Sequence, residues 1–453
     1  MKPSILIALL SFVAITAFAQ DPYDNFARAF AENYSSQNFA AIHDLTSDDF
    51  KKQITKEQIV QVLTGAYAQG GKLSEMKLSE VNDQGRIFHL VCERATFALS
   101  VSLDASGKAA GLLIRPVEQP GGAQDAQSII AKWKSNNANA GLVIGIIRNG
   151  KSDIQYLGVA NKKTSAPIDA TSIFEIGSIS KPITGILLHM LIAEGKISLD
   201  DAVNKFLPND AQLPKVKDKD ILIRHLVTHS SCLPRVPGNF NPPSSELNNP
   251  YHHYSEKELL AFLPQVTTAD CELNTSPVYS NLGAGLLGYI LTKISGNTYA
   301  DLVNERIAKP LKTKNFGVIG ASDRWVQGHT PSGAAQPQWT FTEALVGAGG
   351  VDASVEDMVK LLSFLMKPDQ SPLGKAVVAS TAVQLRGPQG AFGTFWIRQP
   401  KGSSLVLWHN GQTGGFNAFI AWIEGTQTGV FILSNNGEDV ATGLGVAIIG
   451  EEK

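Results

Sequence analysis

The chain has 453 residues, of which 43% are hydrophobic and 18% are charged, and its formal net charge is -2 at pH 7. A chain of this length exceeds one compact core, so we expect an ordinary globular protein with more than one domain. The balanced charge provides no broad field for polyanions, so we expect no nucleic acid and no anionic membrane surface as a partner.

The first 19 residues have the pattern of a cleavable export signal. Lys2 provides a positive start, residues 5–18 form an apolar run, and Ala17-Phe18-Ala19 has the small residues of a cleavage site. The run is shorter than the roughly 20 residues of a membrane helix; the alternative is an uncleaved anchor. No cysteine directly follows the run to carry a lipid, and no later stretch is long and apolar enough to span a bilayer. We therefore expect a periplasmic or secreted protein without an integral membrane segment after signal removal.

Residues 24–116 are predicted to form a small α+β domain. Phe26, Phe30 and Tyr34 recur at helical spacing, Thr55-x-x-Gln58 is a capping-box pattern that opens another helix, and strand patterns follow. This segment weakly resembles the cone-shaped, helix-plus-sheet domains of the nuclear-transport-factor-like class. The resemblance implies an accessory or docking domain, and a cone that holds a ligand is the alternative.

The segment 117–124 contains Pro120-Gly121-Gly122 and is predicted to be a linker to a second domain over residues 125–453. In this second domain Asn149-Gly150 favours a type I′ hairpin, because both positions accept a positive φ. Strand-like stretches lie near both ends of the domain, at 141–160, 404–408, 416–422 and 429–434. Strands at both ends and a mostly helical middle predict an antiparallel sheet flanked by helices, with a helical subdomain inserted. The fold class is therefore α+β.

Ser178 and Lys181 are the first candidate catalytic pair. The motif Ser178-Ile179-Ser180-Lys181 follows a strand-like stretch and precedes an apolar stripe at helical spacing, so it opens a buried helix. Residues three apart share a helix face, which brings the hydroxyl and the amine together. A serine hydroxyl needs a neighbour that takes its proton, and a lysine can do so when burial and nearby groups lower its pKa from about 10.4. For Ser178 alone, a helix cap is the alternative.

Two more motifs follow in chain order. Tyr279-Ser280-Asn281 lies just before an apolar helix at 282–291, and His409-Asn410-Gly411 lies at the end of a predicted strand. Taken alone, Tyr279 would be a buried aromatic residue with a satisfied hydroxyl and Asn281 a helix N-cap. Three motifs in this order are much more specific than any one of them.

With these motifs, the segment from about 125 to 450 resembles the class C β-lactamases, the D-alanyl-D-alanine peptidases and the esterases that share their fold. The resemblance implies the β-lactamase/transpeptidase-like fold and a small-molecule or peptide substrate with an ester, amide or β-lactam carbonyl, without a cofactor. Further matching stretches are Phe174-Glu175-Ile176-Gly177, residues 194–201 and 223–230, Gly349-Gly350-Val351 before Ser354-x-x-Asp357, and Gly414-Gly415-Phe416.

The resemblance also implies the catalytic roles. Ser178 is the nucleophile that forms an acyl-enzyme, Lys181 is its base or the cation that tunes the base, and Tyr279 is the phenol that passes a proton to the leaving group. A phenol needs the nearby Lys181 charge to favour phenolate at neutral pH, so we expect Lys181 and Tyr279 to titrate as a coupled pair.

Four further positions are assigned to substrate binding. By the same resemblance Asn281, His409 and Gly411 contact the substrate, with the Asn281 amide facing the acyl side chain. The backbone N–H groups of Ser178 and Gln412 form the oxyanion hole, where each donor contributes about 3 kcal/mol to the transition state. His225 and His229 are spaced i, i+4, but they lack the intervening Glu and a third ligand, so we expect structural histidines and no metal.

The third motif has His409 where class C β-lactamases usually carry lysine. His-x-Gly is typical of the peptidase and esterase branches. A histidine is mostly neutral at pH 7, so we expect weaker selection for acidic substrates than a lysine would give. This favours an esterase, amidase or D-amino-acid peptidase over an efficient antibiotic-degrading enzyme. A penicillin-binding or pseudoenzyme-like protein that binds or acylates without efficient turnover is the alternative.

The three cysteines are Cys92, Cys232 and Cys271. Cys92 lies among apolar residues and is predicted to be a buried free thiol. Cys232 stands where relatives have glycine, and the resemblance places its segment and that of Cys271 near the rim of the active site. We therefore predict a Cys232 to Cys271 disulfide, which export permits. The alternative is two separate small core residues.

Overall fold

The N-terminal helices and strands are consecutive in the sequence. The computed structural model describes residues 21–82, 85–93, 95–116, 125–136, 140–268, 271–275, 277–387 and 390–452. The chain divides into two units, Met1–Ala123 and Gln124–Lys453. The predicted signal at 1–19 and linker at 117–124 lie outside the described residues. The first unit has the helices α1 (Pro22–Ser35), α2 (Phe39–Asp44), α3 (Asp48–Gln53) and α4 (Lys56–Gly70). They precede a sheet of β1 (Leu73–Asn82), β2 (Gly85–Cys92), β3 (Thr96–Leu103) and β4 (Ala109–Pro116).

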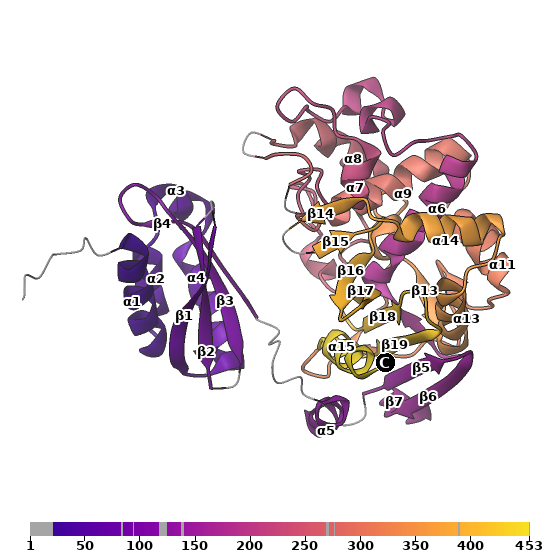
Figure 1. The fold of residues 1–453 in the computed structure, drawn as a ribbon, viewed down its shortest axis with the longest axis horizontal. Helices are drawn as coiled ribbons and strands as arrows, with labels where there is room; N and C mark the ends of the chain where they lie inside the picture. Colours follow the sequence, from indigo (N-terminus) through magenta and orange to yellow (C-terminus); the bar gives the residue numbers. More distant parts are fainter. Residues whose placement is uncertain are drawn as a thin grey trace, which may run out of the picture. The chain divides into compact units, whose positions relative to one another are not determined.

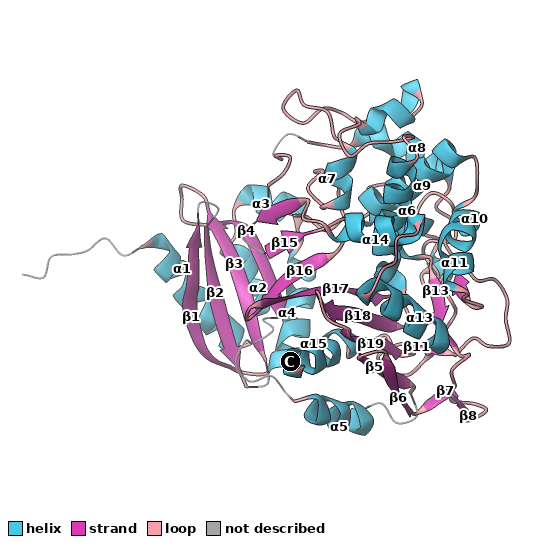
Figure 2. Ribbon diagram, turned by 45° about the vertical axis from the view of Figure 1, so that its right-hand side comes forward, coloured by secondary structure: helices cyan, strands magenta, loops and turns pink. Residues whose placement is uncertain are grey.

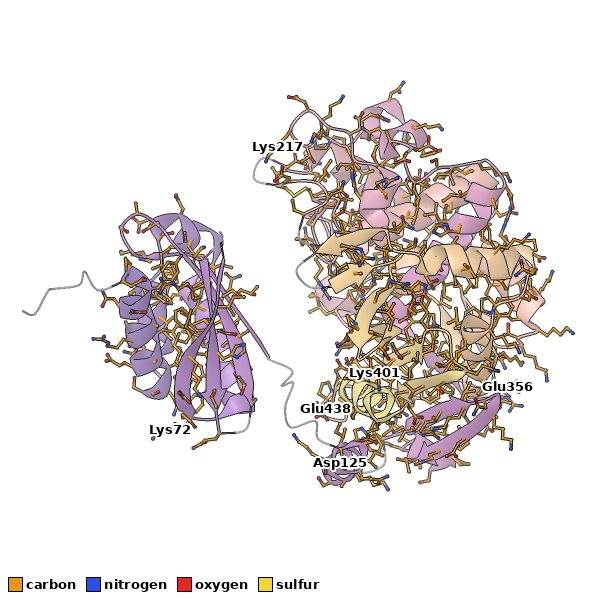
Figure 3. The ribbon with its side chains drawn as sticks, viewed as in Figure 1. Lys72, Asp125, Lys217, Glu356, Lys401 and Glu438 are labelled. Carbon is orange, nitrogen blue, oxygen red and sulfur yellow. A yellow bond between two sulfur atoms is a disulfide. The ribbon has the colours of Figure 1, made fainter. Side chains whose placement is uncertain are left out.

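The four strands of this sheet pair antiparallel in chain order. The predicted capping box is present at the start of α4, where Thr55 and Gln58 satisfy each other's backbone N–H groups. Side chains fill the space between the helices and the sheet (Figure 3). In that space the rings of Tyr34, Phe39 and Tyr67 lie 5.6 to 5.9 Å apart, centre to centre. The interior of this unit is therefore an aromatic core.

The second unit is built on an eight-stranded antiparallel sheet, in the order β14-β15-β16-β17-β18-β19-β5-β6 (Figure 2). The strands from the end of the chain are β14 (Leu385–Gly387), β15 (Gly390–Phe392), β16 (Ile397–Lys401), β17 (Ser404–Gln412), β18 (Asn417–Ile423) and β19 (Thr428–Ser434). β5 (Leu142–Arg148) and β6 (Lys151–Leu157) join beyond β19, so both ends of the domain build one sheet, as predicted. Asn149 and Gly150 have φ values of 50° and 77°, which places both residues of the β5–β6 turn in the left-handed region.

Both faces of the sheet are buried along its central strands β18, β19 and β5. Leu142, Ile144 and Ile146 pack with α5 (Ala126–Asn136) and α15 (Ala441–Glu451), and α15 lies over β18 and β19 (Figure 1). The alternate residues Val143 and Ile147 face the larger core of the helical region. Side chains that alternate along β5 therefore contribute to two separate cores.

The helical region supplies most of the active-site side chains. Its central helix α6 (Ser180–Ala193) is buried at every position from Ser180 to Leu191, as expected of a helix that is apolar around its whole circumference. α6 packs against α9 (Asn281–Ser295), α12 (Val346–Gly349) and α14 (Pro372–Thr381). The other elements are α7 (Ile223–Val227), α8 (Glu256–Phe262), α10 (Tyr299–Val303), α11 (Lys309–Leu311), α13 (Val355–Met366), β7 (Val159–Asn161), β8 (Ala166–Pro167), β9 (Ile173–Glu175), β10 (Phe316–Gly317), β11 (Gly328–His329), β12 (Ala335–Gln336) and β13 (Asp352–Ser354). Among the described helices, none has the length and apolar character needed to cross a membrane.

Candidate active site

Ser178 lies in a single 3-10 turn, Gly177–Ile179, between β9 and α6. The end of β17 runs directly against this turn. Gly177 has a φ of +50°, and a Cβ there would lie 2.8 Å from the Gln412 nitrogen. A Cβ on Gly411 would lie 2.0 Å from the Ile176 carbonyl oxygen and 3.0 Å from the Ser178 nitrogen. Glycine at both positions lets the two backbones approach closely, which brings the N–H groups of Ser178 and Gln412 together.

Lys181 follows one helical turn after Ser178, and its side chain is fully buried. A hydrogen bond of 2.9 Å joins its Nζ to Ser178 Oγ, and Nζ also donates to the Ala348 carbonyl at 2.7 Å. Burial, together with the positive charge of Arg235, lowers the pKa of Lys181 well below its usual value. A neutral amine at this place can accept the Ser178 proton, as a general base must.

Tyr279 completes a cluster around the hydroxyl. Its side chain interacts with that of Ser178, and Lys181 Nζ lies 4.7 Å from the centre of its ring. Burial raises the pKa of Tyr279, while the interaction with Ser178 and the Arg235 charge oppose the rise. The expectation of a phenolate sustained by a charged Lys181 is therefore reversed, because burial disfavours both charges. Neutral amine with neutral phenol holds as many protons as ammonium with phenolate, so the two forms differ only in the place of one proton.

Asn281 is the first residue of α9, and the N-cap of this helix is Ser280, whose hydroxyl accepts the Gly283 N–H at 2.9 Å. The N-cap reading for Asn281 is therefore wrong. Asn281 Nδ2 donates to the Tyr251 hydroxyl at 3.0 Å, whereas Asn281 Oδ1 is buried without a partner in the described structure. An unpaired acceptor beside a pocket is suited to receive an N–H group from a substrate.

A small pocket opens at the nucleophile. Among the predicted residues, Ser178, Asn281 and Gln412 line it. The pocket lining does not include Lys181, Tyr279, His409 or Gly411. Its other lining residues are Gly177, Tyr251, Trp339, Phe341, Ala348, Gly349 and Thr413. The ring of Tyr251 stacks on that of Phe341 at 4.5 Å and lies 5.4 Å from that of Trp339, so aromatic side chains form one wall.

His409 lies on β17 next to the cluster and is only 2% exposed. Its ring centre is 6.4 Å from that of Tyr279. Burial and the charge of Lys181 lower the pKa of His409 to about 3, so the imidazole is neutral at neutral pH. The predicted neutrality of the third motif therefore holds, but His409 faces Tyr279 and does not contact the pocket.

His229 and Arg235 are the neighbours of Tyr279 that the motifs did not identify as site residues. The His229 ring centre lies 4.5 Å from that of Tyr279, and its Nδ1 accepts the Ser280 N–H at 3.1 Å. His225 Nδ1 accepts the Leu222 N–H at 3.0 Å, so both histidines are backbone acceptors. No cluster of three metal-ligating side chains occurs in the described part of the chain. The one sequence signal for these residues is their place in the segment 225–235, which adjoins a matching stretch.

A buried carboxyl pair lies behind the nucleophile. Glu175 on β9 is directly opposite Asp352 on β13, and both are buried. Burial raises the pKa of Glu175 to about 7, while burial and the neighbouring Glu175 raise that of Asp352. Glu175 Oε1 accepts the backbone N–H of Trp339 at 2.7 Å, so Glu175 supports the aromatic wall of the pocket, whereas Asp352 Oδ2 accepts the Ile319 N–H at 3.1 Å.

A disulfide joins Cys232 and Cys271, whose Cα atoms are 5.9 Å apart. Cys232 has a φ of +66°, in the left-handed region that favours glycine. Cys92 is buried in the first unit, and its thiol donates to the Leu90 carbonyl at 3.8 Å.

We expect mass spectrometry of the unreduced protein to find a cross-linked peptide containing Cys232 and Cys271. Replacing Cys271 with serine should lower the free energy of unfolding by up to about 4 kcal/mol, because the disulfide restricts the unfolded chain over a sequence separation of 39. Complete alkylation of both thiols without reductant would contradict the pairing.

The comparisons with known proteins agree with this geometry. Residues 126–446 match the sequence model of the Beta-lactamase family. A β-lactamase of Pseudomonas fluorescens is 27% identical over 333 residues, which cover 65% of this chain and 88% of that protein. The D-alanyl-D-alanine-carboxypeptidase/endopeptidase AmpH of Escherichia coli K12 is 24% identical over 335 residues, covering 70% and 86%.

Among solved structures, a class C β-lactamase from Rhodobacter sphaeroides superposes with a TM-score of 0.62 at 22% identity. The match covers 72% of this chain and 97% of that one, which shows that the fold is shared. The family match spans well over half of the chain. The chain therefore belongs to the Beta-lactamase family and is a serine hydrolase of that type.

Proposed function

We propose that this protein cleaves ester, amide or D-amino-acid peptide substrates through an acyl-enzyme on Ser178. One observation carries the proposal: Ser178 is hydrogen-bonded to Lys181, interacts with Tyr279 and borders a pocket, next to the Gln412 N–H. A nucleophile, a base, an acid and two backbone donors are thus at one place, which is the set that acyl transfer needs.

The reaction begins when Ser178 Oγ attacks the substrate carbonyl and its proton passes to the Lys181–Tyr279 pair. The N–H groups of Ser178 and Gln412 stabilise the negative oxygen of the tetrahedral intermediate. Tyr279 then protonates the leaving group, which departs and leaves the acyl group on Ser178. A water molecule attacks the acyl-enzyme, and its proton passes through the same pair to Ser178 Oγ, so the acid product leaves and the Ser178 hydroxyl is restored.

The absence of a charge at His409 in the third motif bears on which substrate class the enzyme prefers. The relatives include proteins named β-lactamase and one named D-alanyl-D-alanine-carboxypeptidase/endopeptidase. His409 is neutral where a lysine would be a permanent cation, which supports an esterase, amidase or peptidase rather than an efficient antibiotic-degrading enzyme.

We also infer that the protein is exported, to the periplasm or the medium, after removal of residues 1–19. The pattern of the first residues and the Cys232–Cys271 disulfide support this inference, because disulfides persist in oxidising compartments.

The test is a covalent one combined with a substrate panel. A labelled penicillin and a reactive phosphonate are expected to modify Ser178, located by peptide mass spectrometry, and not the exposed Ser332. Short-chain nitrophenyl esters, D-Ala-D-Ala peptides and a chromogenic cephalosporin then show which acyl-enzyme turns over. A lasting adduct without turnover would establish the penicillin-binding alternative, and the absence of any adduct would contradict the nucleophile.

Replacing His409 with lysine is expected to raise the preference for substrates that bear a carboxylate, because it places a cation beside Tyr279. The measurement is the ratio of kcat/KM on a D-Ala-D-Ala peptide or cephalosporin to that on a neutral ester, with the uncharged His409→Gln as the matched control. If His409→Lys loses ester hydrolysis and gains nothing on the carboxylate substrates, the third motif is not the selector.

A further inference from the structure

Arg235 is an exposed arginine held at the edge of the active site. Its guanidinium carbon lies 5.1 Å from the centre of the Tyr279 ring. Its carbonyl oxygen accepts the N–H groups of Asn281 at 2.8 Å and of Leu282 at 3.2 Å, at the start of α9. It follows shortly after the disulfide-bonded Cys232. The backbone of Arg235 is therefore fixed to the catalytic elements, and its side chain is presented to Tyr279.

Among the described residues, none neutralises the charge of Arg235. Within the described residues no carboxylate forms an ion pair with it and no hydrogen bond engages its guanidinium, although five N–H donors are available there. Its field reaches the reaction centre, because it lowers the pKa of Lys181 and of His229 and opposes the rise at Tyr279.

The two histidines of the cluster are uncharged at neutral pH, and burial disfavours a charge on Lys181. Burial lowers the pKa of Lys181 and of His229 well below their usual values, and that of His409 to about 3. Arginine remains protonated at any pH at which proteins are stable. A permanent positive charge therefore lies beside Tyr279 although the third motif provides none.

We propose that Arg235 selects substrates whose leaving group carries a carboxylate. The proposal rests on the proposed function, because the leaving-group side is identified by Tyr279, the residue that protonates the departing atom. A guanidinium binds a carboxylate through two parallel N–H···O bonds, which gives both direction and strength. Arg235, in the segment before α9, thus supplies the positive charge that binds acidic substrates. The neutral His409 on β17 is not needed for this selection.

Three esters test the assignment: 4-nitrophenyl acetate, 3-carboxy-4-nitrophenyl acetate with its charge on the leaving group, and mono-4-nitrophenyl succinate with its charge on the acyl group. In Arg235→Gln we expect the ratio of kcat/KM for the charged leaving group to that for the neutral ester to fall about ten-fold. Arg235→Lys should recover part of the ratio. Arg324→Gln is the matched control, since it removes the same charge from a guanidinium that contacts Thr171 and Asp323. Raising the salt to about 0.5 M should lower the wild-type ratio, because an exposed charge is screened.

A second readout separates electrostatics from structure. Removing a positive charge lets Lys181 keep its proton more readily, so the acidic limb of the kcat/KM profile on the neutral ester should move to higher pH in Arg235→Gln and not in Arg235→Lys. An unchanged ratio, an equal loss on all three esters with an unmoved acidic limb, or a change confined to the succinate would overturn the proposal. Failure of the proposed function is distinct: wild-type protein would then show no Ser178-dependent hydrolysis of any of the three esters.

Discussion

Replacing Ser178 with alanine is expected to abolish turnover of every substrate class, with a loss on the order of 10⁴- to 10⁶-fold in kcat. The substitution removes the attacking oxygen and leaves the oxyanion donors, which are backbone groups. The fold should be retained, because Ser178 is only partly buried and Lys181 keeps its hydrogen bond to the Ala348 carbonyl.

The measurement is initial rates over the substrate panel, together with thermal unfolding to show that the variant is folded. Ser332→Ala serves as the matched control, because it removes an exposed hydroxyl far along the chain from the nucleophile. The assignment of the nucleophile is wrong if folded Ser178→Ala retains most of the wild-type rate.

Lys181→Ala and Tyr279→Phe are each expected to lower kcat/KM by about 10² to 10⁴, the usual contribution of general acid–base catalysis. Their double mutant should be far less damaged than the product of the two single losses. The reason is that both side chains interact with the same hydroxyl and share one proton in the proposed mechanism, so removing either one interrupts the same path.

A double-mutant cycle measures this coupling. Lys181→Met retains most of the buried volume and checks whether a cavity, rather than the lost amine, causes the effect. Tyr289→Phe is the control for a lost phenol, since its hydroxyl bonds Glu256 on α8. Losses that multiply strictly would show that the two groups act independently.

The local parts of the site could be predicted from the sequence. The spacing of Ser178 and Lys181 on one helix face predicts their contact, and the glycine of the third motif matches the close approach of β17 to the nucleophile turn. The Asn149-Gly150 turn and the strands at the two ends of the domain likewise predict how the sheet closes. In each case the structure follows from short-range geometry or from a pattern that extends over a whole element.

The long-range parts could not be predicted in this way. The contact of Arg235 with Tyr279 depends on the path of an irregular segment, and the acceptor for Lys181 is a backbone carbonyl at Ala348, which no side-chain pattern identifies. The aromatic wall combines Tyr251 with Trp339 and Phe341 from a distant loop. The sequence also predicts the wrong direction for the shift of the Tyr279 pKa. Burial by several separate segments raises this pKa, and the depth of burial does not follow from the motifs.

The closure of the large sheet by both ends of the second unit has a consequence for biogenesis. β5 hydrogen-bonds along its length to β19, so Leu142 pairs with Ser434 and Arg148 with Thr428. During synthesis from the N-terminus, β5 can pair at once with β6, but its other edge has no partner until almost the whole chain has been made, and contacts of such large sequence separation form slowly. The first unit, whose strands pair only with their sequence neighbours, can fold long before. The large sheet of the hydrolase unit therefore stays open at β5 through most of translation, and the unit can complete its fold only after β19 has been made.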